Sequence, residues 1–212
     1  TWEDVASLDL KGEVAAFDSL DEVAGIAWAQ NIDKLYDGDM LDLTSIYTAT
    51  YNAVFPIHNA GLTNGNRSGD QNWYGSFSTE SKLISQGAIW MVPVIGFLTE
   101  GDAHLDNYVV INAPDGNYVS GGTSMGIYNG SENKEVAWNY LQWFLLSKEG
   151  ADVNKDNNIF ISLKSAYEDP IYTEMYNKNT GEQNIGEKYY QIATEVPELK
   201  LNEYTIKNGG LR

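Results

Sequence analysis

The sequence contains no cysteine, which excludes disulfide bonds, thiolate metal sites and cysteine nucleophiles. It is also poor in basic residues: 13 Lys and Arg stand against 30 Asp and Glu, leaving a formal net charge of −17. Phosphate backbones and anionic lipids bind clusters of Lys and Arg, so we expect neither a nucleic-acid partner nor an anionic membrane partner. No apolar run approaches the ~18 residues of a membrane-spanning helix.

Signatures of catalysis and cofactor binding are missing as well. The two histidines, His58 and His104, have no second His or Cys at ligand spacing. The sequence holds no P-loop, no dinucleotide fingerprint and no Gly-x-Ser-x-Gly motif. We therefore expect no cofactor and no enzymatic activity.

One acidic segment has partial calcium-loop spacing. Asp152, Asn154 and Asp156 occupy positions one, three and five of such a loop. Position six would hold Asn157 in place of Gly, and position twelve would hold Leu163 in place of Glu. We expect a polar turn here, with calcium binding as the alternative.

Aromatic residues are abundant. They make up 12% of the chain, with 14 Tyr and 6 Trp, and hydrophobic residues reach 42%. This content is enough for a core, and aromatic rings also suit stacking on sugar rings.

The most informative stretch runs from 119 to 150. It predicts a strand at 119–128 that carries Gly121 and Gly122, then a turn, then a helix at 133–147 that ends near Gly150. Apolar residues cover most of the circumference of this helix, so it must be buried on several sides or expose an apolar surface. Five residues advance a helix by about 140° net, so Trp138 and Trp143 point to different sides.

Periodicity and turn residues predict the remaining elements. Ser19 and Glu22 form a capping box at the start of a helix that ends near residue 37. We expect further helices at 45–55, 77–86, 165–177 and 186–195. The predicted strands are 88–95, 108–112 and 159–162, and long loops are expected at 59–73 and after 197.

These segments resemble a known family. The double glycine, NKE at 133–135, the aromatic helix and SKEG at 147–150 are similar to the extracellular solute-binding proteins of sugar ABC transporters, in particular the maltodextrin-binding-like proteins. VNKD at 153–156 and SLKSAYEDP at 162–170 resemble the region that follows, and TWEDV at 1–5 resembles a segment after the first hinge crossing. The resemblance covers the C-terminal portion of such a protein and is specific over 119–170.

The resemblance implies an α/β fold with periplasmic-binding-protein-like type II lobes, each a mixed sheet flanked by helices. Residues 1–117 and 169–212 would form the second lobe, and 118–168 would cross into a first lobe whose N-terminal part is absent. Because the chain starts at Thr1, we expect a processed product or a fragment. The implied function is the substrate-binding component of an oligosaccharide ABC importer, which would bind its solute in a cleft between the two lobes by aromatic stacking and hydrogen bonds. The resemblance implies a location outside the cytoplasm, in the periplasm or as a cell-surface lipoprotein.

Eight candidate residues would contact the ligand. Trp73 ends a loop and Phe97 follows an apolar run, so their rings could stack on a sugar; core packing is the alternative for every aromatic candidate. The double glycine would bring backbone close to the ligand. The full set is Trp73, Tyr74, Trp90, Phe97, Gly121, Gly122, Thr123 and Ser124.

Two other classes of function stay open. A secreted carbohydrate-active enzyme fragment would need two carboxylates about 5–10 Å apart in a cleft, one with a raised pKa. A structural or interaction domain would lack an aromatic-lined cleft. In the binding-protein interpretation the partners are a small carbohydrate, the ABC permease subunits, and either the missing lobe or a second copy docked on the 133–147 helix.

Overall fold

The computed structural model describes residues 1–10, 14–38, 40–67, 69–79, 82–98, 108–119, 124–157, 159–177 and 180–196, without the side chains of 96–98. Within these ranges helices predominate, and the one sheet is a two-stranded antiparallel hairpin. The mixture of helix with a smaller amount of strand agrees with the expected class at that level. No helix in the described ranges is both long and apolar enough to cross a bilayer.

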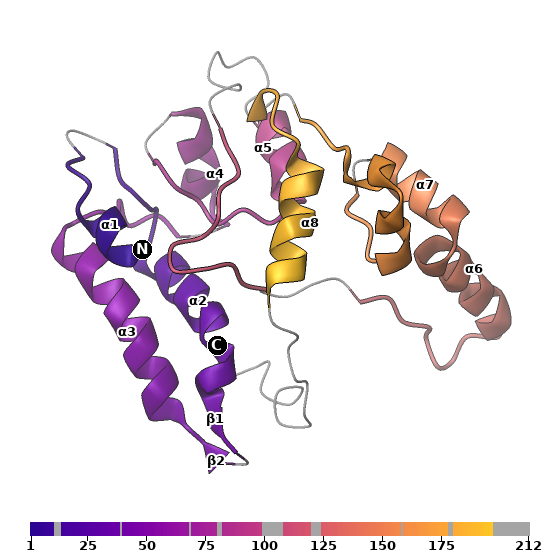
Figure 1. Ribbon diagram of the computed structural model, residues 1–212, viewed down its shortest axis with the longest axis horizontal. Helices are drawn as coiled ribbons and strands as arrows, with labels where there is room; N and C mark the ends of the chain where they lie inside the picture. Colours follow the sequence, from indigo (N-terminus) through magenta and orange to yellow (C-terminus); the bar gives the residue numbers. More distant parts are fainter. Residues whose placement is uncertain are drawn as a thin grey trace.

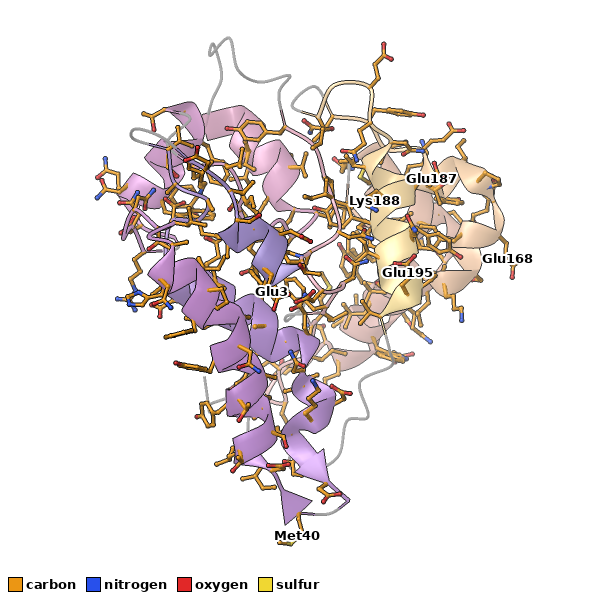
Figure 2. All side chains as sticks on the ribbon, turned by 60° about the vertical axis from the view of Figure 1, so that its left-hand side comes forward. Glu3, Met40, Glu168, Glu187, Lys188 and Glu195 are labelled. Carbon is orange, nitrogen blue, oxygen red and sulfur yellow. The ribbon has the colours of Figure 1, made fainter. Side chains whose placement is uncertain are left out.

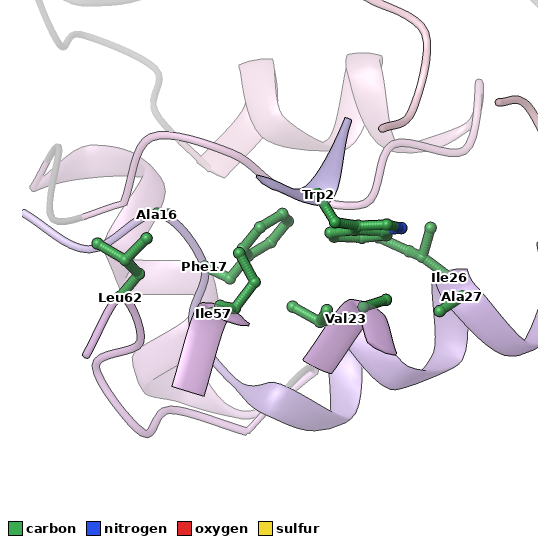
Figure 3. Close-up of a cluster of buried hydrophobic side chains, with 9 residues drawn as sticks. Trp2, Ala16, Phe17, Val23, Ile26, Ala27, Ile57 and Leu62 are labelled. Atoms are coloured by element: carbon green, nitrogen blue, oxygen red, sulfur yellow. The ribbon is translucent and has the colours of Figure 1, made fainter. Parts of the chain in front are cut away.

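Three helices form one end of the molecule (Figure 1). They are α1 (Trp2–Ala6), α2 (Leu20–Gln30) and α3 (Leu43–Asn59), and a short 3-10 turn, η1 (Ile32–Leu35), leads into the hairpin β1 (Tyr36–Asp37) and β2 (Met40–Leu41). Thr1, Ser19 and Asp42 cap α1, α2 and α3 by accepting hydrogen bonds from backbone N–H groups in the first turn. The buried side chains of these three helices form one core around Phe17 (Figure 3).

An extended segment lies at the centre of this end of the molecule. Ala15 bridges Lys82 and Phe17 bridges Thr63, both in parallel orientation. The N–H groups of Leu83 and Ile84 donate to the carbonyls of Ala15 and Ala16, each over 2.8 Å. Residues 15–17 are therefore paired on both sides by segments far away in the sequence.

The middle of the molecule contains α4 (Gln71–Ser78), α5 (Met91–Leu98) and α8 (Ile185–Glu195) (Figure 1). Trp73 and Phe77 of α4 pack on Met91 of α5. Val92, on the next position of α5, packs on Met175 and Ile185. The α5 helix therefore packs on α4 at one position and, at the next, on Met175 and on Ile185 at the start of α8.

The other end contains α6 (Lys134–Leu146), α7 (Lys148–Asp156) and two 3-10 turns, η3 (Lys164–Glu168) and η4 (Pro170–Thr173). Ala151, Ile161, Ala166 and Tyr172 form its small core. No residue of α6 is buried, and Trp138 and Trp143 are 51% and 41% exposed. The expectation that this helix exposes an apolar surface is confirmed.

Several expected boundaries are confirmed. Helices occupy 43–59, 134–146 and 185–195, close to the predicted positions. The helix after Ser19 begins where predicted but ends at Gln30 rather than near residue 37, and the chain continues there as the 3-10 turn η1. Gly150, predicted to end the helix at 133–147, lies within α7 instead. The helix predicted over 165–177, with an interruption at Pro170, is replaced by the two 3-10 turns η3 and η4, and Pro170 begins the second of them.

Other expectations are wrong. The predicted strand at 88–95 is mostly helix α5, because Pro93 stands at the third helical position, where its missing N–H has no intrahelical partner to lose. The predicted helix at 77–86 begins earlier and ends at Ser78, since Asp70 rather than Ser78 provides the N-cap. The described residues of the predicted strands at 108–112, 119–128 and 159–162 belong to no strand.

Candidate functional site

A cavity of about 420 Å³ lies between the 82–87 segment, α5, the 108–111 segment and α8. Cavities that bind small molecules have this order of size and a mainly apolar lining with a few polar groups. Phe77, Met91, Ile95, Tyr108 and Tyr189 supply rings and aliphatic surface to its walls. Lys82, Ser85, Gln86 and Thr180 are the polar residues of its lining.

Hydrogen bonds orient two tyrosine rings at this cavity. The Tyr189 hydroxyl donates to the carbonyl of Gly87 over 2.8 Å, and the Tyr108 hydroxyl donates to the carbonyl of Phe77 over 2.5 Å. Burial raises the pKa of Tyr189 to about 12, so its hydroxyl is protonated at neutral pH. A protonated, anchored phenol can pack on a ligand and accept a hydrogen bond, and it is not a base.

The 82–84 segment is anchored behind the cavity by a buried ion pair. Asp18 follows the central extended segment and is fully buried, and its carboxylate pairs with Lys82. Asn64 donates to the other oxygen of Asp18 over 2.8 Å, and Asn66 does so over 3.1 Å. Burial lowers the pKa of Lys82, while the Asp18 carboxylate opposes that change.

Aromatic rings complete the surroundings of Lys82. Its ammonium lies 3.7 Å from the ring centroid of Phe77 and 4.4 Å from that of Trp73. Cation–π attraction adds to the ion pair in such a desolvated position. Lys82 is therefore held in place from several sides and forms a fixed part of the cavity wall.

A second carboxylate supports the polar wall of the cavity. Glu22 accepts from the Gln86 N–H over 2.6 Å and from the Ser85 hydroxyl over 3.2 Å through Oε1, whereas its buried Oε2 has no hydrogen-bond partner. Burial raises the pKa of Glu22, and the negative charge of Asp18 raises it further by a smaller amount. Neither Asp18 nor Glu22 lines the cavity.

Two predicted ligand residues lie together on α4. Trp73 is 5% exposed, and its ring meets Tyr74 at 4.9 Å and Phe77 at 5.1 Å in edge-to-face geometry. Tyr74 packs on the same cluster and is half-buried. The structure therefore places Trp73 in the layer behind Phe77, and Phe77 is the ring that reaches the cavity.

The remaining predicted residues are separate from this cluster. Trp90 lies just before α5 and is 59% exposed, and it does not line the cavity. The backbone of Phe97 belongs to α5, but its side chain is outside the described part. Gly121, Gly122 and Thr123 are also outside the described residues, and Ser124 is exposed.

Sequence reasoning missed most of the cavity walls. Tyr189 had a usable signal, because it stands four residues after Ile185 on the buried face of a predicted helix. Lys82 had none, since its partner Asp18 lies 64 residues away. A single Lys between Ser81 and Leu83 is typical of a solvated side chain when only the sequence is considered.

Metal binding finds no support in the described residues, which contain no group of three or more His, Asp and Glu side chains placed to hold an ion. The segment with partial calcium-loop spacing lies in α7, so the expected polar turn is wrong there. Asp152 accepts from the Tyr172 hydroxyl over 2.5 Å and pairs with Lys148 over 3.2 Å.

No protein-family model matches this chain, and no curated protein matches it.

Proposed function

We propose that this chain is part of the substrate-binding component of a carbohydrate ABC importer and that it binds its solute without chemical change. The observation that carries the proposal is the cavity of about 420 Å³, whose walls combine aromatic rings with a few anchored polar groups. Sugar sites use this combination because ring faces stack on the apolar C–H faces of a sugar while polar groups bind its hydroxyls. The resemblance of residues 119–170 to such binding proteins supports the same function.

The placement of the carboxylates favours binding over catalysis. A glycosidase needs two carboxylates that reach the substrate from the walls of a cleft. Asp18 and Glu22 are both buried and are committed to Lys82, Ser85 and Gln86. Their role is therefore to hold the cavity wall, and a hydrolytic function is the weaker candidate.

The exposed surface of α6 fits the proposed two-lobe architecture. Val136, Trp138, Tyr140, Trp143 and Leu146 all expose large apolar side chains. Apolar patches of this kind usually mark an interface. In the proposed architecture residues 1–117 and 169–212 form one type II lobe, and 118–168 pack on the other lobe, which in turn faces the permease outside the cytoplasm.

Substitution at the cavity mouth tests the proposed function. Val109 lines the cavity and is largely exposed, so Val109→Trp should fill the opening without disturbing the core. Val119→Trp is the matched control, since Val119 is also exposed but does not line the cavity. Calorimetry with neutral di- and hexasaccharides should show a Kd raised about tenfold or more by Val109→Trp and unchanged by Val119→Trp.

Two results would count against the proposal. The first is the absence of binding heat for every neutral saccharide in a panel of glucose-, galactose- and xylose-based probes. The second is an equal effect of the two valine substitutions on Kd. Turnover of any probe that is lost on replacing a single carboxylate would favour the enzyme instead.

A further inference from the structure

A second cavity, of about 410 Å³, lies at the opposite end of the described structure from α6, between α1, α2, α3 and the 114–116 turn. Its character differs from that of the first cavity, because amide and charged side chains dominate its walls. Those walls include Gln30, Asn31 and Asn52 together with Glu3, Lys34 and Asp115. Trp2, Ala49 and Ala53 complete its lining.

The 114–116 turn is held firmly at this cavity. The side-chain amide of Gln30 donates to the carbonyls of Pro114 and Gly116, each over 2.5 Å. Asp115 has a φ of 62°, in the left-handed region that residues with a Cβ rarely adopt, and its carboxylate accepts from the Trp2 N–H over 3.5 Å. Gln30 therefore holds the backbone of the turn, and the Asp115 carboxylate on the cavity wall has one contact, with the Trp2 N–H.

An aromatic ridge lies on α3, the helix that also supplies Ala49, Asn52 and Ala53 to the cavity. Tyr47, Tyr51 and Phe55 follow one another at four-residue spacing and are 57%, 57% and 44% exposed. The rings of Tyr51 and Phe55 are stacked at 5.0 Å, and Tyr47 meets Trp28 edge-to-face at 5.3 Å. Eight residues of helix span about 12 Å, so the ridge is as long as two to three sugar rings. In Figure 2, α3 runs from the hairpin labelled at Met40 toward Glu3 on the cavity wall.

The exposed face of α3 carries no formal charge at neutral pH apart from any on His58. None of its 17 residues is Asp, Glu, Lys or Arg, although the chain has a net charge of −17. Thr44, Thr48 and Asn52 stand beside the rings on the exposed side, and Asn52 also lines the cavity. Stacking rings with hydroxyl and amide neighbours match an uncharged ligand that has both C–H faces and hydroxyl groups, while the acidic remainder of the protein repels anions.

We propose that this polar cavity and the α3 ridge form a second binding site for a neutral oligosaccharide. One sugar unit enters the cavity, where the carboxylate of Asp115 and the amide of Asn52 bind its hydroxyls, and the following units lie along Tyr51 and Phe55. The inference takes its ligand class from the proposed function but uses residues that do not line the first cavity.

The test uses calorimetry with maltohexaose, cellohexaose and xylohexaose as neutral probes and hexagalacturonate as the anionic one. Tyr51→Ser combined with Phe55→Ser should raise the Kd of at least one neutral hexasaccharide about tenfold or more. Tyr128→Ser combined with Tyr176→Ser is the matched control, since both tyrosines are exposed and lie outside α3. Asp115→Asn tolerates the left-handed backbone and should weaken the same probe, because it removes the charged acceptor.

The outcomes separate this site from the first cavity. Loss of hexasaccharide affinity in the α3 variant, with disaccharide binding unchanged, supports the second site even if Val109→Trp has no effect. Loss only in Val109→Trp supports the proposed function and overturns the second site. Equal binding of hexagalacturonate also overturns it. Conversion of an oligomer to a monomer by the α3 variant, without a change in saccharide affinity, would show that the ridge binds a second copy of this chain instead.

Discussion

Asp18 and Lys82 form an ion pair inside the protein, with their side chains 0% and 3% exposed. They come from segments 64 residues apart, and the pair forms where these segments run in parallel beside each other. Removing one member of a buried pair leaves an uncompensated charge, whereas removing both can be nearly neutral. The pair therefore favours the pairing of these two segments over other pairings. Its main effect on the free energy of unfolding is the loss that follows when one partner is removed.

We predict that Asp18→Asn lowers the free energy of unfolding by about 3–5 kcal/mol, because the Asn amide faces the Lys82 ammonium without a compensating charge. Asp18→Asn combined with Lys82→Met should recover most of that loss, since Met restores apolar contact with Phe77. Urea unfolding followed by tryptophan fluorescence measures both. Equal losses in the single and double variants would mean that the charge itself is unimportant.

Glu22 predicts a pH dependence of stability. Burial raises its pKa above the ordinary value of 4.5, so the folded state holds a proton more tightly than the unfolded chain does. Stability should therefore fall as the pH rises from 4.5 through the raised pKa, and the penalty should be absent below 4.5. The charged and titratable groups that act on it are Lys82, Asp18 and Tyr118.

Glu22→Gln isolates this contribution. The Gln carbonyl can still accept from the Gln86 N–H and the Ser85 hydroxyl. The variant should have a higher Tm than the parent at pH 8 and the same Tm at pH 4, with thermal melts followed by circular dichroism. A constant difference between the two proteins at every pH would show that Glu22 does not titrate in this range.

The apolar surface of α6 predicts self-association when nothing else covers it. Trp138→Ser combined with Tyr140→Ser should lower the association constant of the chain, as measured by sedimentation velocity over a concentration series. Because both rings are exposed, the free energy of unfolding should change by no more than about 0.5 kcal/mol. A parent chain that sediments as a monomer at every concentration would contradict the prediction.

Gly150 predicts a steric requirement where α7 meets α6. A Cβ at this position would lie 2.2 Å from the carbonyl oxygen of Trp143 and 2.5 Å from that of Phe144. Gly150→Ala should therefore destabilise the protein by about 1–3 kcal/mol, because backbone must shift to make room. Chemical denaturation measures the effect.

Gly25 provides the matched control within α2. A Cβ there would meet nothing within 4 Å, so Gly25→Ala should stabilise the protein by about 0.5–1 kcal/mol through helix propensity alone. Destabilisation by both substitutions to the same extent would argue against the tight approach of α6 and α7.

Local signals in the sequence determined some of the helices. The capping residue Ser19 and the apolar periodicity of 133–147 act over a few residues, and both helices form where they predict. The same periodicity also predicted an exposed apolar face, because a helix with apolar residues around its circumference needs more cover than two neighbouring segments provide. Composition alone predicted an acidic protein, and this charge disfavours binding to nucleic acid and to anionic lipid.

Tertiary structure decided the rest. The apolar run at 88–95 has no period that separates strand from helix, and packing of Met91 and Val92 into two different clusters selected the helix. Lys82 became part of a cavity wall because Asp18, 64 residues away, pairs with it, and Trp73 became a core residue because Met91 of another helix packs in the same cluster. Such contacts depend on which distant segments meet, and no local pattern in a single sequence encodes that meeting.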